Sequence, residues 1–273
     1  MHTINIQRAN ATFQQLEVLR RNREKRHRQR AFLVEGVRPI KKLIASNWPL
    51  QAMIYAQQRP LSDWARTVLA SRHAPTHYAL APELFAQLST KNEPGELIAL
   101  AEIPPDQLDR IPIQPDLLVL VFDRPASPGN LGTLIRSCDA LGAHGLIITG
   151  HATDLYDPET VSATTGSLFA LPSIRLSNPR ELEPWIMAVR HNLGSLQVVG
   201  SDEHGSHSID AQSWHGPTIL VLGNETWGMS AYFRQLCDSI VSIPMGGSAS
   251  SLNVASAGSI LLYEIARQRR DGA

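Results

Sequence analysis

Two kinds of hydrophobic pattern alternate along this chain, and together they predict an α/β protein. Short, almost uninterrupted apolar runs, such as DLLVLVFD (116–123) and TILVLG (218–223), are typical of strands buried in a parallel sheet. Longer stretches with apolar residues three or four positions apart, as in the C-terminal segment 252–269, are typical of helices. Strands that alternate with helices favour parallel sheets covered by helices.

The second half of the chain repeats this alternation most regularly. It predicts an open parallel sheet with helices on both faces. The expected strands are 116–123, 145–150, 196–200, 218–223 and 239–244, and the expected helices are 130–141, 178–192, 230–238 and 252–269.

The first half predicts a smaller α/β domain over about residues 30–103. It is followed by IPPDQLDRIPIQP, whose four prolines are typical of a stiff linker. We therefore expect three segments: a basic N-terminal segment and small domain over 1–103, a Pro-rich linker over 104–115, and a second domain over 116–273.

Three loops of the second half follow predicted strands and are rich in small or polar residues: 123–136, 223–230 and 243–253. Ligands of open parallel sheets bind beyond the carboxyl ends of the strands, so these loops are expected to form one crevice. They contain no GxGxxG or Walker sequence, which argues against a dinucleotide or P-loop nucleotide. The histidines show no metal-ligand spacing, and no metal is expected.

Charge is distributed unevenly, although the formal net charge of the chain is zero. Residues 1–45 hold 11 Lys/Arg against 3 Asp/Glu, so the remaining residues carry the opposite balance. A basic run can be only a solvated helix face, but this density equally favours a polyanion such as RNA. Seven basic residues form the run: Arg20, Arg21, Arg23, Lys25, Arg26, Arg28 and Arg30.

Membrane and secretory signals are missing from the sequence. No apolar run approaches the length of a membrane span, and the N-terminus lacks the apolar core of a signal peptide. Cys138 and Cys237 belong to no paired motif, which argues against a disulfide scaffold. We expect a cytoplasmic protein with no membrane partner.

The three loops lie in longer motifs: NLGTLIRSCDALGAHGLII (130–148), LVLGNETWGMS (220–230) and IPMGGSASSLNVASAGSILLYE (243–264), with VSATTGSLFALP (161–172) between the first two. These motifs resemble the SpoU (TrmH-like) branch of the SPOUT RNA methyltransferases. The similarity covers about residues 116–270, with small departures at Thr226 and Ala255. The segment REKRHRQRAFLVEGVRPIKKLI (23–44) more weakly resembles the start of the family's N-terminal substrate-binding domain.

The resemblance implies a fold, a cofactor and partners. The fold is a knotted (trefoil) parallel-sheet SPOUT methyltransferase domain preceded by a small α/β RNA-binding domain. It implies S-adenosylmethionine bound in the knot, a homodimer, and methyl transfer to a ribose 2′-hydroxyl of RNA. Ribosomal RNA is favoured over tRNA, because the added N-terminal domain resembles that of rRNA-modifying members. The residues implied to hold the cofactor are Leu222, Gly223, Asn224, Ile243, Met245 and Leu252.

Five residues are implied to be catalytic, and each has a structural alternative. Arg136 can assist loss of the hydroxyl proton as a base or as an electrostatic stabiliser; a guanidinium stays protonated at neutral pH, which favours the second. Without the motif it would read as a surface arginine. The other four are Asn130, Glu225, Ser251 and Asn253. Asn130 could instead cap its helix, and Asn253 or Ser251 could only bond loop amides. Glu225 could be an ordinary loop acid, whereas the motif implies that it orients Arg136, a substrate group or the backbone amides of the knot.

Two other functions remain open from the sequence. A non-catalytic RNA-binding or ribosome-assembly factor could keep this fold, although intact motif residues argue against it. A small-molecule methyltransferase would leave the basic segment without a use.

Overall fold

The computed structural model describes residues 2–71 and 73–271, and the chain forms two compact units. The first unit comprises Met1–Pro104 and Tyr156–Ala170, and the second comprises Pro105–Leu155 and Leu171–Ala273. The α/β class and the parallel sheet of the second half are confirmed. None of the described helices is long and apolar enough to cross a bilayer.

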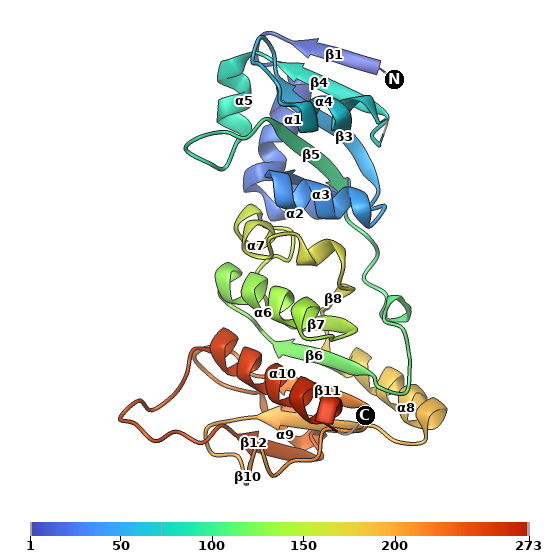
Figure 1. Cartoon of the computed structure of the whole chain (residues 1–273), viewed down its shortest axis with the longest axis vertical. Helices are drawn as coiled ribbons and strands as arrows, with labels where there is room; N and C mark the ends of the chain where they lie inside the picture. Colours follow the sequence, from blue (N-terminus) through green and yellow to red (C-terminus); the bar gives the residue numbers. More distant parts are fainter. Residues whose placement is uncertain (1, 72, 272–273) are drawn as a thin grey trace. The chain divides into compact units, whose positions relative to one another are not determined.

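The second unit is built on a seven-stranded sheet in the order β10-β12-β9-β11-β6-β7-β8 (Figure 1). Every pairing in this sheet is parallel, so the carboxyl ends of its strands share one edge. The strands are β6 (Leu118–Asp123), β7 (Gly145–Thr149), β8 (Ser173–Leu176), β9 (Gln197–Ser201), β10 (His207–Ser208), β11 (Thr218–Leu222) and β12 (Ser239–Ser242).

Helices cover both faces of this sheet, because the side chains of each strand alternate between two apolar faces. Val119 and Val121 of β6 belong to a buried cluster with residues of α8 (Leu182–Leu193) and α9 (Ala231–Leu236). On the other face, α6 (Pro128–Ala140) packs along α10 (Val254–Asp271). Short 3₁₀ turns occur at Leu108–Arg110 and Pro179–Glu181.

Two helices begin a little away from their predicted starts, and caps explain both differences. The helix predicted at 130–141 begins at Pro128, because the Ser127 hydroxyl accepts from the Asn130 amide and proline suits the first turn. The helix predicted at 252–269 begins at Val254, because the Asn253 side chain accepts from the amides of Ala255 and Ser256.

The first unit has a five-stranded sheet in the order β1-β4-β3-β5-β2, in which β5 runs antiparallel to both neighbours. Helices α1 and α5 bury apolar side chains against it. The strands are β1 (His2–Ile6), β2 (Ala31–Glu35), β3 (Leu50–Ala56), β4 (Thr76–Leu80) and β5 (Leu97–Glu102). The helices are α1 (Ala11–Arg21), α2 (Arg23–Gln29), α3 (Val37–Ala45), α4 (Asp63–Ala70), α5 (Pro82–Leu88) and α7 (Pro158–Ala163), with a 3₁₀ turn at Ser167–Phe169.

Tyr156–Ala170 packs in the first unit, although it lies inside the predicted range 116–273. Its aromatic residues explain the placement. The rings of Tyr156 and Phe169 have centroids 4.8 and 6.4 Å from that of Phe32 on β2, and Phe169 also contacts Trp48 at 5.2 Å. This segment therefore completes an aromatic core that residues 1–104 leave unfinished.

The basic run of the first unit includes arginines with internal structural roles. Arg26 is only 2% exposed; its guanidinium donates to the carbonyls of Leu19 and Arg20 at 2.8 and 3.2 Å and pairs with Asp157 at 3.2 Å. Arg30 ends α2 in a left-handed conformation and donates to the Ile103 carbonyl.

Replacing Arg26 with alanine is expected to destabilise the first unit by about 3 kcal/mol, because it strands buried carbonyls and the Asp157 carboxylate. Arg28→Ala, an exposed change in the same helix, is the matched control and should shift stability by less than about 0.5 kcal/mol. Urea unfolding of the full chain measures both. Equal midpoints for the two variants would contradict the structural role of Arg26.

Candidate active site

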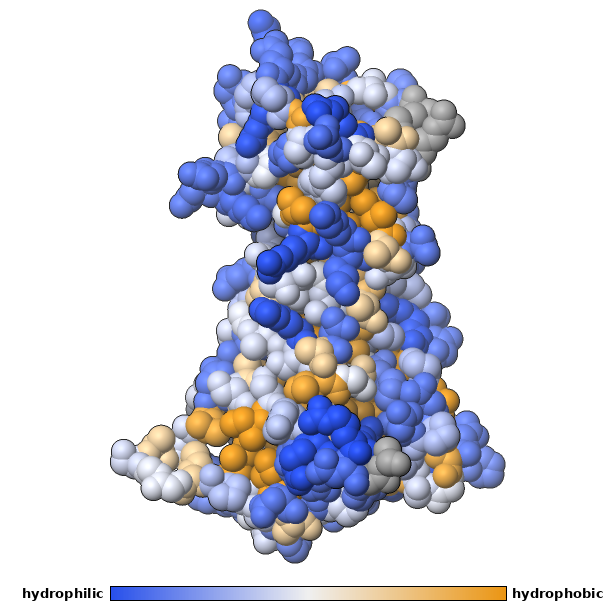
Figure 2. All heavy atoms as spheres, in the orientation of Figure 1, coloured by the Kyte–Doolittle hydropathy of each residue, from blue (hydrophilic) through white to orange (hydrophobic). Residues whose placement is uncertain are grey.

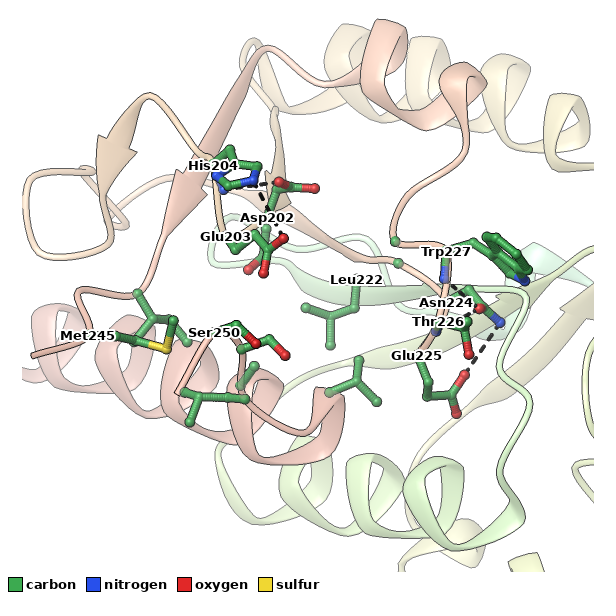
Figure 3. A pocket seen from close by; sticks show the side chains of 18 of the residues that line it. Asp202, Glu203, His204, Leu222, Asn224, Glu225, Thr226, Trp227, Met245 and Ser250 are labelled. Carbon is green, nitrogen blue, oxygen red and sulfur yellow. Dashed lines mark hydrogen bonds and ion pairs between the residues drawn. The ribbon is translucent and has the colours of Figure 1, made fainter. Parts of the chain in front are cut away.

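A cavity of about 500 Å³ lies in the second unit beyond the carboxyl ends of β9 and β11. This volume falls within the usual range for cofactor and small-ligand sites, about 300–1,000 Å³. In Figure 3 the loop after β11 bounds one side of it, and Met245 and Ser250 bound the other. Eight of the predicted site residues line it: Leu222, Gly223, Asn224, Glu225, Ile243, Met245, Ser251 and Leu252.

Glu225 joins the loop after β11 to the loop after β6. Its carboxylate accepts from the backbone amides of Ala126 at 2.9 Å and Ser127 at 3.0 Å, and from the Asn130 side chain at 3.3 Å. A carboxylate that accepts several hydrogen bonds in this way holds its loop firmly. Of the roles considered for Glu225, the structure shows the hydrogen bonds to backbone amides.

Asn253 extends the connection to the third loop. Its side-chain Nδ2 donates to the side-chain Oδ1 of Asn130 at 3.1 Å, while its own Oδ1 caps α10. Glu225, Asn130 and Asn253 therefore form one hydrogen-bonded chain across three loops that lie far apart in the sequence. The expected convergence of these loops is found in the second unit.

An ion pair between buried Asp123 and half-buried Arg124 supports the same loops. Asp123 is 2% exposed at the end of β6; its carboxylate pairs with Arg124 at 3.0 Å and accepts from the Ser230 amide at 2.8 Å. Arg124 in turn donates to the Gly228 carbonyl at 3.0 Å. Neither Asp123 nor Arg124 was among the site residues predicted from the sequence.

Glycine is required at Gly223 because two stretches of backbone meet there. A Cβ atom at this position would lie 2.2 Å from the backbone of Gly228 and Met229. Asn224 and Gly228 exchange two backbone hydrogen bonds of 3.0 Å, and Gly228 adopts a φ of 64°. The loop thus turns back on itself beside the cavity, and a side chain at residue 223 would prevent this.

The chemistry of the cavity suits a ligand with an apolar and a cationic part, as S-adenosylmethionine has. Met245 and Leu252 are 41% and 40% exposed, which leaves apolar surface for a ligand to cover. Carboxylates from Asp202, Glu203 and Glu225 line the space, whereas Arg234, which also lines it, is paired with Asp202. The cavity residues implied for the cofactor therefore fit it.

The third loop, residues 243–253, is exposed from Met245 to Asn253 and forms the pale arm at the lower left of Figure 2. Its surface has intermediate hydropathy because glycine, serine and alanine dominate it.

Arg136 lies apart from the cavity lining. It is six residues after Asn130 on α6, which separates them by roughly 9 Å along the helix axis. Its side chain is exposed and forms no hydrogen bond or ion pair within residues 2–71 and 73–271. Its guanidinium is therefore available to a ligand.

Sequence reasoning missed Asp202, whose carboxylate lines the cavity. The sequence did contain a signal for it, because Asp202 directly follows strand β9 at the ligand-binding edge of the sheet.

The two cysteines do not offer a nucleophile. Burial raises the pKa of the Cys138 thiol far above its usual range, and burial together with Asp238 raises that of Cys237 to about 12.

Known families match both parts of the chain. Residues 117–263 match the SpoU rRNA Methylase family, and residues 10–99 match the SpoU L30e-like domain. The chain is 50% identical over 264 residues to a 23S rRNA (uridine(2479)-2′-O)-methyltransferase of Streptomyces viridochromogenes, an alignment that covers 96% of this chain and 92% of that protein.

Solved structures resemble the chain over nearly its whole length. The SpoU methyltransferase AviRb of Streptomyces viridochromogenes, in complex with the cofactor AdoMet, has a TM-score of 0.92 at 50% identity and covers 97% of this chain and 100% of its own. An AdoMet-bound rRNA methyltransferase of Sinorhizobium meliloti has a TM-score of 0.86 at 27% identity, with 97% of this chain and 98% of its own covered.

Glu225→Gln is expected to destabilise the second unit by about 1–3 kcal/mol, because the new amide group faces backbone donors and leaves one of them unsatisfied. Glu203→Gln, which changes an exposed carboxylate of the same cavity, is the control and should leave stability almost unchanged. Thermal and urea unfolding measure the difference. A Glu225→Gln protein as stable as the control would remove this carboxylate as the support of the loops.

Proposed function

We propose that this chain, which belongs to the SpoU rRNA Methylase family, transfers a methyl group from S-adenosylmethionine to a ribose 2′-hydroxyl of ribosomal RNA. The observation that carries the proposal is the hydrogen-bonded chain Glu225–Asn130–Asn253 at the edge of a cofactor-sized cavity. The 23S rRNA 2′-O-methyltransferase at 50% identity supports the same reaction and favours rRNA over tRNA. Ribosomal RNA as the substrate also favours a cytoplasmic enzyme.

The cofactor supplies an electrophilic sulfonium methyl group when it is bound. This chain's residues have to hold the ligand, orient the 2′-oxygen and assist loss of its proton. We assign ligand binding to the cavity and its flanking loops. The residues are Leu222, Gly223, Asn224, Ile243, Met245 and Leu252.

Arg136 is assigned to the 2′-oxygen as an electrostatic stabiliser. Its exposed guanidinium has no protein partner among the described residues, so its donors are free for an oxygen that gains negative charge. Asn130 and Asn253 are assigned to orientation, because each fixes the other. Ser251 also lines the cavity, and its hydroxyl is assigned to orientation as well.

We also propose a homodimer and a trefoil knot. Ile260 and Tyr263 of α10 are 40% and 53% exposed and offer apolar surface to a second copy. Arg136 lies outside the lining of its own chain's cavity, which is consistent with a site completed across an interface. The knot is supported by the return of the chain from β12 through 243–253 to α10, which packs on α6.

Methyl transfer to 23S rRNA tests the proposal, and Arg136→Ala tests the mechanism. Wild type should produce one 2′-O-methylated ribose, mapped in rRNA from cells with and without this protein. Arg136→Ala should lower the single-turnover rate by about 10²–10³ and leave cofactor affinity nearly unchanged. Labelled methyl incorporation and calorimetric titration measure the two quantities.

Arg136→Lys separates the two roles open to this arginine. Lysine keeps the positive charge but lacks the planar guanidinium with its several N–H donors. If Arg136 stabilises the oxygen through that geometry, the activity of Arg136→Lys should be as low as that of Arg136→Ala at every pH. Partial activity of Arg136→Lys that increases with pH would instead show that residue 136 acts as a base.

Absence of methyl transfer by wild type, with RNA still bound, would favour a non-catalytic RNA-binding factor.

The exposed basic residues of the first unit are assigned to the RNA backbone. Arg26 is buried and is the least available of the seven, and Arg20 donates to the Ser89 carbonyl at 3.1 Å. Arg21 and Arg28 are exposed, and Lys25 is partly exposed. Arg30 donates to the Ile103 carbonyl, and Arg23 also interacts within the protein. We therefore narrow the proposed phosphate contacts to Arg21, Lys25 and Arg28.

Changing Arg21, Lys25 and Arg28 together to glutamine should weaken binding to many RNAs alike. The slope of log affinity against log salt concentration should flatten by about one per lost phosphate contact. Fluorescence anisotropy over a salt series measures it. Loss of affinity for a single RNA with an unchanged slope would show that the segment reads sequence or shape instead.

A further inference from the structure

Trp227 is a large aromatic side chain left in solvent at the rim of the cavity. It is 77% exposed, the highest value among the large hydrophobic residues in the described part of the chain. Tryptophan presents a broad apolar face, and covering it in a complex is favourable. Nothing in the reaction assigned above uses this side chain.

The backbone that carries Trp227 is held in place before any ligand arrives. The Asn224 side-chain oxygen accepts from the amides of Thr226 at 2.9 Å and Trp227 at 3.0 Å. The paired backbone bonds between Asn224 and Gly228 close the loop that carries Trp227. A ligand that binds the ring therefore meets a preorganised loop, which lowers the ordering cost of binding.

The ring points away from the middle of the cavity. Figure 3 shows the indole directed outward from the loop, on the opposite side from Leu222 and Ser250. Trp227 also follows Glu225, the residue bonded to Asn130, by two positions. The indole thus lies on the outer side of a loop that also carries Glu225, and it is directed away from the space assigned to the cofactor.

We propose that the Trp227 indole stacks on an unpaired RNA base at or beside the nucleotide that is methylated. The proposal rests on the proposed function and adds a specific contact to it. Sequence-specific RNA recognition uses splayed bases stacked on aromatic side chains, and stacking tolerates any base. Trp227 is in this view a positioning residue that fixes the target ribose relative to the cavity.

The surroundings of Trp227 favour a base over a phosphate or a protein surface. Arg234 is the one Lys or Arg among the lining residues, and it is paired with Asp202, so phosphate attraction at this rim is weak. The neighbours Asn224, Glu225 and Thr226 are polar and do not extend the indole into an apolar patch. A second copy of the chain has better apolar surface on α10, at Ile260 and Tyr263.

The test compares Trp227→Ala and Trp227→Phe with wild type in binding a fluorescein-labelled 23S rRNA transcript, followed by anisotropy over a salt series. Met187→Ala, which removes a side chain 65% exposed on α8, is the matched control. Trp227→Ala should weaken RNA binding about 5–150-fold, as expected for one stacked base. The salt slope should not change, and Trp227→Phe should lie between alanine and wild type.

Three measurements on the same proteins can overturn the proposal. RNA affinity of Trp227→Ala equal to that of the control would exclude stacking. A loss of S-adenosylmethionine affinity in calorimetry would assign the indole to the cofactor, and a change of oligomeric state in sedimentation would assign it to a second copy. Wild type that binds the transcript without methylating it would count against the proposed function alone, because stacking is measured by binding.

Discussion

The carboxylate of Glu225 is the interaction on which the site depends. It accepts hydrogen bonds from the two consecutive backbone amides that precede α6. It also accepts from the side chain of Asn130, which in turn accepts from Asn253, the residue that caps α10. Strands β6 and β11 are neighbours in the sheet, but their loops are free to diverge beyond its edge. The Glu225 carboxylate, with its several donors, holds these loops together, and the ion pair of buried Asp123 with Arg124 holds the Gly228 carbonyl beside them.

The arginines of this chain show how the same side chain is used in opposite ways. Arg26 and Arg124 donate to several acceptors and hold backbone in place. Arg136 is exposed and has no partner among the described residues. A guanidinium has five donors, so an arginine without protein acceptors keeps its full capacity for an anionic oxygen. The bonding pattern, rather than the residue type, separates the structural arginines from the one proposed to act on the ribose.

Much of the second unit could be predicted from the sequence, because its buried strands are continuous apolar runs and its loops follow them directly. The convergence of the three loops followed from strand direction alone. The partners of Glu225 could not be predicted, because they depend on how each loop leaves the sheet. Arg26 reads as one of seven similar cations, and only the placement of Asp157, 131 residues later, identifies it as buried. The contribution of Tyr156–Ala170 to the first unit was missed for the same reason: its aromatic contacts with Phe32 are not local in sequence.

The discontinuous first unit has a consequence for synthesis of the protein. Its aromatic core requires Tyr156 and Phe169, which lie after β6, α6 and β7 of the other unit. A nascent chain that has reached Pro104 must therefore wait for roughly 65 more residues, or about 3–13 s at common elongation rates, before this core can close. During that interval Phe32 lacks the two rings that pack against it in the finished unit. The N-terminal unit, made first, is thus unable to finish folding first.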